Sequence, residues 1–570
     1  MAANNAAPRC YVDIYPYEGG KYSLTGDAAG VLSCITHKDI RSTGPGTFDI
    51  KLAPGGPLGP NSGPSWTEII TPMSLVVIGM KRYHHRQIVM IGVVTEPIET
   101  QTWETGRGVQ RVINIRGGDF QYLFSTFSYY TLSLLGATRG VSLSQGGVNL
   151  GLPELLGKAL LSGTPAQVGA AWFNVVMGGT EGILAQTNYM YNGAKVSFPN
   201  IMASLFEEYP TTNGGVRIPY SNFYMITSGN WTEKFLQTFP FPWYEFFVTT
   251  APVGYRPYDT QNNTIAYNSA TNQSYVSTGM SGAATPISMN AQDGTGFLPA
   301  SPTLVARVNP LPYTSSYNNG KFVMDSSRWQ NNLQRFSLEN TGFIKSTVAF
   351  NTSEVRNFYV INPTFFTQQF GISNSNMNAF IYTFASWIDN ASIHRYGYRP
   401  EIFQIQWFSD PSGQQAQLNV AQQENFQQLV QNLALRQTSY FEPTPNMAKG
   451  SVSMELRPDI LPGNVFTYSP FKNGSDWDFY ITGVTQTYIF GEQSNTTLSI
   501  DRGLPKSVYD DVQMLTALHT GTAIRQNGKY NVPNPIVNGL QPISIGTTSI
   551  QQILGQSAQI FTTPQGAVGQ

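Results

Sequence analysis

Alternating apolar and polar residues dominate the first 120 positions of the chain and predict a series of short β-strands. The pattern places these strands at Arg9–Tyr17, Val31–Thr36, Gly46–Leu52, Leu75–Met80, Ile88–Thr95 and Gln110–Arg116. Alternation with a period of two, bounded by turn residues, is typical of half-buried strands. Such a run of short strands, with a Pro/Gly-rich loop at residues 54–64, indicates a small antiparallel barrel.

Longer apolar patterns follow and predict helices in a first insertion. They lie at Phe124–Leu135, Leu152–Leu161 and Phe198–Tyr209. Strands resume at Phe246 and include Leu304–Val308 and Ile344–Phe350. The β pattern returns at Gly450 after a second insertion that holds a predicted helix at Val420–Arg436. A second barrel is therefore predicted to be discontinuous in sequence, with strands on both sides of an insertion.

Two stretches about 390 residues apart have the same order of turn, strand and Gly-centred strand. The first comprises residues 68–78, 88–95 and 109–117, and the second comprises residues 457–466, 479–485 and 497–503. Pro72 precedes Gly92 by 20 positions, and Pro462 precedes Gly483 by 21. Glycine and β-branched residues fill turns and strands in any β-rich chain, so chance similarity is the alternative. The Arg-Gly ending of both copies favours an internal repeat.

These patterns predict a β-rich α+β protein with two tube-like antiparallel β-barrels, mixed or helical insertions and an extended C-terminal arm. The first barrel is expected at residues 1–118 and an α-rich insertion at 119–245. The second barrel is expected at 246–361, with a long polar loop at 255–296, and again at 450–504. The second insertion is expected at 362–449. A C-terminal helix near Asp510–Ala523 and a low-charge arm are expected within 505–570, because the final 41 residues contain no charged side chain and cannot form a core.

Composition narrows the functional classes. Only 12% of residues are charged, 54 are Gly and 36 are Pro, and the net charge is −1. This leaves a polar but uncharged surface without the basic field that holds a phosphate backbone, although a passive channel for DNA needs no such field. The first residues lack the apolar segment of a secretory signal. Residues 159–180 are interrupted by Pro and polar residues, so we expect packed helices there and no stable membrane insertion.

Few residues suggest metal or nucleophilic chemistry. His84 and His85 are adjacent between two β patterns, and they predict a hairpin turn more than a metal pair, because neighbouring strand residues face opposite sides. His37, His394 and His519 are isolated. The two cysteines, Cys10 and Cys34, could form one disulfide, but free buried thiols are favoured in a chain of this length.

Three acidic pairs are candidates for glycoside hydrolysis, which needs two carboxylates several ångströms apart. They are Glu207 with Glu208, Asp476 with Asp478, and Asp510 with Asp511. A solvated surface position is the favoured interpretation of each pair. We therefore predict no catalytic residue, no cofactor site and no metal site, and a non-enzymatic protein.

Several segments together resemble one family of viral structural proteins. They are residues 304–312 (LVARVNPLP), 351–360, 395–400 (RYGYRP), 457–463 (RPDILPG), 480–485 (YITGVT) and the Arg-Gly at 502–503. In this order they resemble central baseplate hub proteins of contractile-tailed bacteriophages, over roughly residues 9–505. Each short motif is weak by itself, and the order of the elements is more specific.

The resemblance implies a homotrimer at the end of the tail tube, in which two barrels per subunit form a pseudo-sixfold ring. It implies contacts with the tail tube protein, the central spike protein, the tape-measure protein and other baseplate proteins, with DNA only as a transient passenger. The implied location is the virion baseplate, after assembly in the host cytoplasm. Two alternatives are a tail-associated cell-wall-degrading enzyme and a trimeric tail fibre or receptor-binding protein. Duplication of a barrel within each subunit would let a threefold assembly match a sixfold tube.

Overall fold

The structure is a computed structural model. It describes most residues of two β-rich regions and shorter segments elsewhere in the chain. The described residues are 7–17, 19–57, 63–104, 108–126, 161–163, 190–191, 194–195, 200–203, 218–221, 244–252, 265–268, 273–276, 287–290, 296–310, 314–318, 321–325, 333–338, 342–363, 387–388, 390–405, 441, 447–471, 476–505, 524–526 and 529–531.

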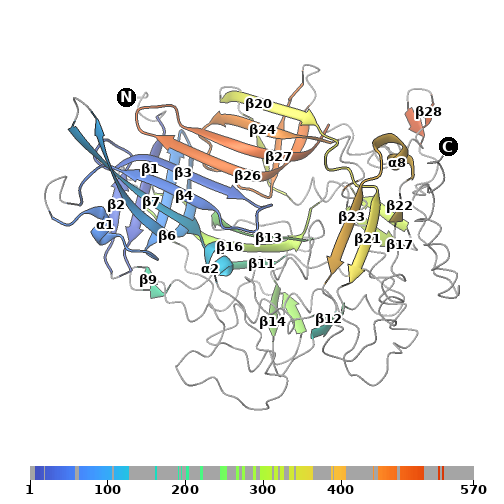
Figure 1. The fold of residues 1–570 in the computed structure, drawn as a ribbon, viewed down its shortest axis with the longest axis horizontal. Coiled ribbons are helices and arrows are strands. Elements are labelled where there is room, and N and C mark those ends of the chain that lie inside the picture. The colour runs from blue at the N-terminus through green and yellow to red at the C-terminus, as the bar shows by residue number, and fades with distance from the viewer. Residues whose placement is uncertain are drawn as a thin grey trace, which may run out of the picture.

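A 13-stranded, mostly antiparallel sheet contains both β-rich regions (Figure 1). The first region, in blue, curls in the order β2-β1-β5-β6-β7-β4-β3. Its strands are β1 Arg9–Tyr15, β2 Tyr22–Thr25, β3 Val31–Asp39, β4 Thr47–Leu52, β5 Leu75–Arg82, β6 His85–Glu104 and β7 Gly108–Asp119. All six predicted strands are present, β6 and β7 extend beyond the predicted ends, and β2 was not predicted. Two short helices, α1 (Trp66–Ile69) and α2 (Gln121–Thr126), flank this region.

The second region contributes six strands in the order β19-β25-β26-β27-β24-β20. They are β19 Arg335–Ser337, β20 Phe343–Phe350, β24 Ala448–Glu455, β25 Val465–Tyr468, β26 Trp477–Ile489 and β27 Asn495–Pro505. The chain leaves this region after β20 and returns at β24, so the second copy is discontinuous in sequence. The β-rich antiparallel fold class is thereby confirmed.

The two regions have the same strand order, in sequence and in space. Strands β1, β5, β6, β7, β4 and β3 of the first correspond to β19, β25, β26, β27, β24 and β20 of the second. Irregularities also coincide. The register shifts between Val31 and Ser33 where β3 pairs with β4, and between Phe343 and Lys345 where β20 pairs with β24. One difference is that β1 is antiparallel to β5, whereas β19 is parallel to β25.

The turn before β5 is repeated before β25 in atomic detail. Met73 and Gly463, each directly after a proline, have φ angles of 69° and 76°. Their N–H groups donate to the carbonyl oxygens of Val94 and Ile481 at 2.7 and 2.8 Å. A left-handed residue after proline is costly unless it is glycine, and the first copy nevertheless has Met73 there. The shared geometry identifies Val94 with Ile481.

A bulge in the following strand confirms this correspondence. The register shifts between Val94 and Glu96 in β6 and between Ile481 and Gly483 in β26. The bulged residues are Thr95 and Thr482, whose hydroxyls donate to Arg116 O at 3.3 Å and to Ser499 O at 3.2 Å. Bulges are specific features of a strand pair, so the shared positions are strong support for an internal duplication.

The residue match expected from the sequence is wrong in detail. Gly483 corresponds to Glu96, not to Gly92, and Arg116 corresponds to Ser499, not to Arg502. The turn between β5 and β6 is shorter than the corresponding turn between β25 and β26. Pattern matching therefore aligned like residues that occupy different positions of the ladder.

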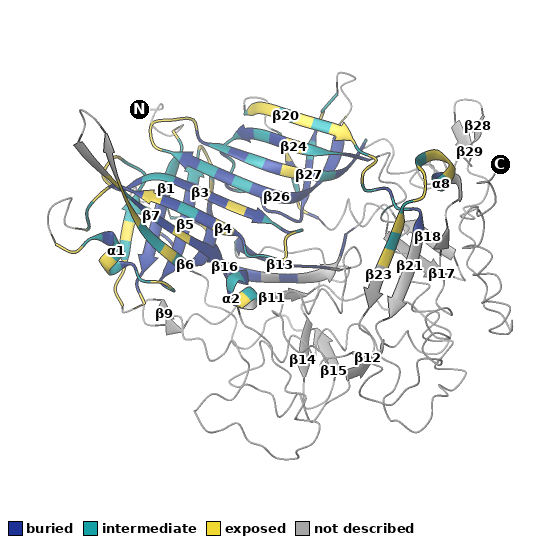
Figure 2. Ribbon diagram, viewed as in Figure 1, coloured by how far each residue is buried: buried dark blue, intermediate teal, exposed yellow. Residues whose placement is uncertain are grey.

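Each region has its own apolar core (Figure 2). The first core is closed by Leu456 and Tyr488, which belong to the second region. The second core includes Phe466, Phe479, Trp477 and Leu498. Cys10 and Cys34 are free and buried in the first core, as predicted. A hydrogen bond with the Cys10 thiol, together with burial, raises the pKa of the Cys34 thiol, which keeps it protonated and unreactive.

Strands predicted for the second barrel near residues 246–308 lie outside the large sheet. β13 (Tyr244–Pro252) pairs with β16 (Ala300–Val308) over nine residues, and β16 pairs on its other edge with β11 (Asn200–Ala203). The helix predicted at Phe198–Tyr209 is wrong where β11 forms, because tertiary pairing with β16 overrides the helical apolar spacing. A second three-stranded sheet consists of β22 (Trp387–Ile388), β21 (Phe358–Pro363) and β23 (Pro400–Ile405), next to α8 (Asn390–Tyr396).

The remaining described strands are short pairs. They are β8 Leu161–Gly163 with β12 Ile218–Ser221, β9 Met190–Tyr191 with β10 Ala194–Lys195, β14 Ile265–Asn268 with β15 Gln273–Val276, β17 Thr314–Asn318 with β18 Lys321–Asp325, and β28 Ile524–Gln526 with β29 Lys529–Asn531. The predicted loop at 255–296 thus contains the β14–β15 hairpin. The helices predicted at 420–436 and 510–523 lie outside the described residues, as does most of the arm.

Candidate functional site

The two copies of the sheet are joined edge to edge, and this joint is the candidate functional site. Strand β3 of the first copy pairs with residues 483–489 of β26 in the second copy, from Gly483↔Asp39 to Ile489↔Ser33. Side chains reinforce the joint: Thr36 Oγ1 lies 3.3 Å from Gln486 Oε1, and His37 Nδ1 lies 2.8 Å from Thr485 Oγ1. Backbone pairing across an edge also removes unpaired N–H and C=O groups from solvent.

The hairpin between β5 and β6 makes a second contact between the copies. Arg82 forms a 2.8 Å ion pair with Glu455 at the end of β24. His85 Nδ1 lies 3.2 Å from Asp459 Oδ1, in the turn that precedes β25. Arg457 also binds this carboxylate through two nitrogens, at 2.9 and 2.8 Å.

The charge partners of Asp459 determine its protonation. Burial alone would raise the pKa of its carboxyl group, but the hydrogen bonds and charge of Arg457 and the nearby His85 outweigh burial and lower the pKa. Two nitrogens of one guanidinium on one carboxylate form a geometrically specific pair. Asp459 is therefore a fixed anion that orients the turn at the joint.

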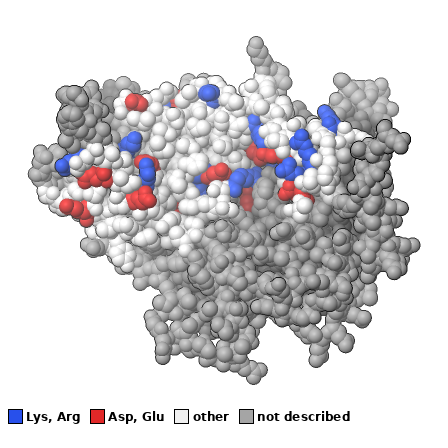
Figure 3. Space-filling view, viewed as in Figure 1, with Lys and Arg blue, Asp and Glu red and all other residues white. Residues whose placement is uncertain are grey.

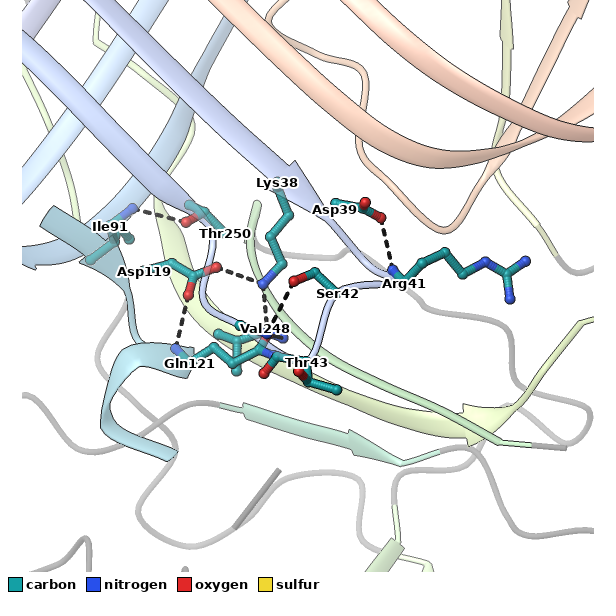
Figure 4. A network of polar contacts seen from close by, with 11 residues as sticks. Lys38, Asp39, Arg41, Ser42, Thr43, Ile91, Asp119, Gln121, Val248 and Thr250 are labelled. Atoms are coloured by element: carbon teal, nitrogen blue, oxygen red, sulfur yellow. Dashed lines mark hydrogen bonds and ion pairs between the residues drawn. The ribbon is translucent and has the colours of Figure 1, made fainter. Parts of the chain in front are cut away.

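Beneath the joint lies a buried polar network (Figure 4). Lys38 Nζ, at the end of β3, donates to Asp119 Oδ2 at 2.8 Å and to Gln121 Oε1 at 2.6 Å. Gln121 Oε1 also accepts from the backbone N–H of Val248 at 3.1 Å, and Gln121 N donates to Asp119 Oδ1 at 3.0 Å. The network thus ties β3, the end of β7 and β13 together.

Burial and charge act in opposite directions on Asp119. Burial raises the pKa of its carboxyl group above the ordinary value, while the Lys38 ammonium opposes the increase. The Lys38 side chain is 8% exposed and the Asp119 side chain is 4% exposed. A buried pair of this kind stabilises little against an apolar replacement, but loss of one partner leaves a charge without compensation. The network is therefore suited to fixing the relative positions of β3, β7 and β13.

Two segments that carry the family resemblance meet in the second insertion. Asn357 Nδ2 donates to Gly397 O at 2.7 Å, and Arg399 N donates to Asn357 Oδ1 at 2.7 Å. Arg356 Nε binds Glu401 at 2.7 Å. The RYGYRP segment and the segment after β20 are thus parts of one polar contact that positions α8 and β23.

The histidines show no arrangement for metal binding in the described ranges. Tyr83 and His84 form the turn of the β5–β6 hairpin, which confirms the predicted hairpin. His37 contacts Thr485, and His394 is exposed on α8. No group of three or more His, Cys, Asp or Glu side chains in these ranges is placed to hold a metal ion. His519 lies outside them.

Of the acidic pairs, only Asp476 and Asp478 are described. Asp476 accepts from Ser469 at 2.9 Å. Asp478 is fully buried and accepts from Arg335 and Thr467, both at 2.5 Å. The solvated interpretation is therefore wrong for Asp478, because it lies in β26 with its side chain toward β19 and β25. Each oxygen of the carboxylate has one partner, and the carboxylate thereby ties β26 to β19 and β25.

Sequence reasoning missed the Lys38–Asp119 pair. The available signal was a lysine at a buried position of an alternating strand, together with an aspartate that directly follows two glycines at the end of β7. Neither residue identifies its partner, since they are 81 positions apart. Gly46 leaves room for this pair: a Cβ there would lie 2.6 Å from Asp119 Oδ2 and 2.8 Å from Lys38 Cδ.

The described surface carries few charges, and those of opposite sign are interspersed (Figure 3). Mixed charges at low density give no extended field of one sign on this face. None of the helices in the described part of the chain is long and apolar enough to cross a membrane.

Some solved structures of other proteins are similar to this chain. No family model matches the sequence, and no curated protein matches it. The tail protein from Neisseria meningitidis MC58 is similar at a TM-score of 0.34 and 10% identity, over 86% of this chain and 96% of that one. The 43 kDa tail protein of prophage MuSo2 from Shewanella oneidensis has a TM-score of 0.36 and 8% identity, over 87% and 98%.

A component of the type VI secretion system from E. coli, itself structurally similar to T4 bacteriophage tail proteins, is also similar to this chain. The TM-score is 0.31 and the identity 10%, over 84% of this chain and 74% of that one. These TM-scores lie below 0.5, so the functional proposal rests on contacts within this chain. The three solved structures named above are components of phage tails and of a secretion system.

Proposed function

We propose that this chain is a structural, non-enzymatic subunit of a tail baseplate hub, acting as a homotrimer that joins a sixfold tail tube to a threefold central spike. The observation that carries the proposal is the duplicated sheet, with its shared bulges, joined edge to edge by β3 and β26. Three chains would then present six equivalent sheets. Duplication within the subunit lets a threefold assembly meet a sixfold one without breaking symmetry.

The chemistry of the surface supports a passive role. With 12% charged residues and a net charge of −1, an assembled ring would hold neither a tape-measure protein nor DNA by a strong field. We infer that the ring lines the channel through which both pass, at the baseplate of the virion. The insertions, including the β21–β23 sheet, are then available to bind the spike and neighbouring baseplate proteins.

The mass and shape of the purified chain test this proposal. Light scattering is expected to give about 188 kDa, three times the chain mass of 62.7 kDa. Electron-microscopy class averages are expected to show six similar densities in a ring. A monomer at every concentration, or a ring of another order, would contradict the proposed trimer. Clearing of cell walls in a zymogram would instead support the enzyme alternative.

A further inference from the structure

Two of the open strand edges in the described part of the large sheet belong to β20 and β6. β20 pairs with β24 on one edge and has no described strand on the other. β6 pairs with β5 only over residues 85–93, so its later residues pair with β7 alone. An open edge is a template for pairing with another chain.

These two edges correspond to the pair that joins the copies within the chain. The matched bulges identify β20 residues 345–351 with β3 residues 33–39. The matched turns and bulges identify β6 residues 96–102 with β26 residues 483–489. The chain therefore contains one closed joint of this type, and one copy of each edge of that joint left over.

Burial distinguishes the closed joint from the open edges (Figure 2). Lys38 in β3 is 6% exposed, whereas Phe350 at the same position of β20 is 52% exposed. On the other side, Gln486 is buried, whereas Glu99 at its position in β6 is exposed. Phe343 and Ile344 add further exposed apolar surface to β20. An exposed apolar edge is unfavourable in a monomer and suits a strand partner.

We propose that β20 of one chain pairs antiparallel with residues 96–102 of β6 in the neighbouring chain of the assembly. The register is the one that β3 and β26 use within a single chain. This inference rests on the proposed trimer and specifies the surface that forms it. The register places Thr347 opposite Thr100, with Lys345 opposite Thr102. Because the edges of β20 and β6 differ, the contact between chains is head-to-tail, and three chains close into a ring.

The backbone of the closed joint shows which groups would bond. Ile40 N donates to Thr482 O, and Phe490 N donates to Leu32 O, both at 2.9 Å. Since hydrogen-bonded pairs alternate in an antiparallel ladder, Val484 also faces β3 with its N–H. Its counterpart in β6 is Pro97, which has no N–H. The joint between chains therefore has one hydrogen bond fewer than the joint within a chain. Proline is tolerated at such an edge position.

Glu99 remains paired when the joint covers it. Its carboxylate lies 3.9 Å from Arg111 Nη1, and it accepts from Thr67 Oγ1 at 3.5 Å. Gln486, the counterpart, similarly donates to Pro458 O in the equivalent turn. Coverage of a paired carboxylate by Val348 avoids the cost of burying an isolated charge.

Disulfide trapping in the full-length chain tests the register. Thr100 and Thr347 are exposed and would form a non-hydrogen-bonded pair, whose Cα atoms lie about 4.5 Å apart, within the range that a disulfide spans. The variant Thr100→Cys/Thr347→Cys, oxidised with glutathione disulfide, is expected to give linked pairs and triplets of chains on a non-reducing gel. Each link oxidises two thiols and reduces one glutathione disulfide.

Two controls match this variant. Ile35→Cys/Thr487→Cys lies at the equivalent place in the closed joint and is expected to link within one chain, with loss of both thiols. Ile98→Cys/Thr347→Cys is diagonal in the proposed register, at about 7–8 Å, and is expected to remain unlinked. The wild-type chain controls for Cys10 and Cys34.

The outcomes separate this inference from the proposed trimer. Trimers of about 188 kDa in which Thr100→Cys/Thr347→Cys does not link, or links no better than the diagonal pair, would overturn the register alone. A monomer without links would overturn both. Linked species larger than three chains would support the joint but contradict the trimer. Restoring the missing donor with Pro97→Val is expected to tighten association about threefold to tenfold per joint; no change would count against the register.

Discussion

The first and second copies of the sheet share strand order and bulges but differ in what covers their outer edge. β3 is covered by β26 and carries a lysine that reaches into a buried network. Among the described residues no strand covers β20 in this way, and at the position of Lys38 it has Phe350, which stacks on Phe471 with ring centroids 6.0 Å apart. The two copies therefore share strand order and bulges, although β19 is parallel to β25 where β1 is antiparallel to β5. Their edge residues suit different surroundings: a buried polar network at β3 and an exposed apolar edge at β20.

Of the changes considered, replacement of Lys38 should lower the free energy of unfolding the most. Lys38→Met leaves the buried Asp119 carboxylate without its ammonium partner, and we expect a loss of about 3–5 kcal/mol in unfolding free energy. Phe350→Met, at the equivalent and half-exposed position, should cost less than about 1.5 kcal/mol. Denaturant unfolding of both variants measures the difference. Equal losses would mean that the network does not distinguish the copies.

Replacement of either bulge threonine should lower the free energy of unfolding by an intermediate amount, which should be equal for the two copies. Thr95→Val and Thr482→Val each remove one hydroxyl donor to a backbone carbonyl, with little change of shape. We expect each variant to lose about 0.5–1.5 kcal/mol. Thermal unfolding of the two single variants and of the double variant provides the measurement. A clear inequality would show that the two bulges, although alike in geometry, are not equivalent in energy.

The smallest effect should appear in the pH dependence of the buried Asp119 and the partly buried Asp459. Asp459 has a lowered pKa, so the stability it contributes is present above its unfolded pKa of about 3.9 and is lost as the pH falls through the folded value. Asp119 has a raised pKa, so its contribution is present below about 3.9 and is lost as the pH rises through the folded value.

Unfolding free energies measured from pH 3 to pH 7 should therefore respond with opposite sign in Asp459→Asn and Asp119→Asn. Asp459→Asn should lessen the acid-side loss by under about 1 kcal/mol, since the side chain is partly exposed. Asp119→Asn should instead lessen the loss on raising the pH. A shift of the same sign in both variants would contradict the assigned directions.

Local patterns were sufficient for the strands of the first copy and for the β5–β6 hairpin. Alternation predicted β1, β3, β4, β5, β6 and β7. Burial alternates in β3 and β4 as the strand period requires, whereas β1 and β5 are buried on both faces. The pattern was insufficient at β11, where apolar residues at helical spacing form a strand beside β16. It also failed for Asp478, since burial of an acidic side chain depends on Arg335, which is 143 positions away.

The sequence by itself determined that the chain is β-rich and that a turn-and-strand module occurs twice. Proline at positions 72 and 462 and the alternation after each are local features, and backbone sterics and side-chain period act within a few residues. Only the tertiary structure decided the register of the repeat and the partner of each edge. Thr36 meets Gln486 across 450 positions, and a strand edge offers the same N–H and C=O groups to any partner, so no local rule selects one.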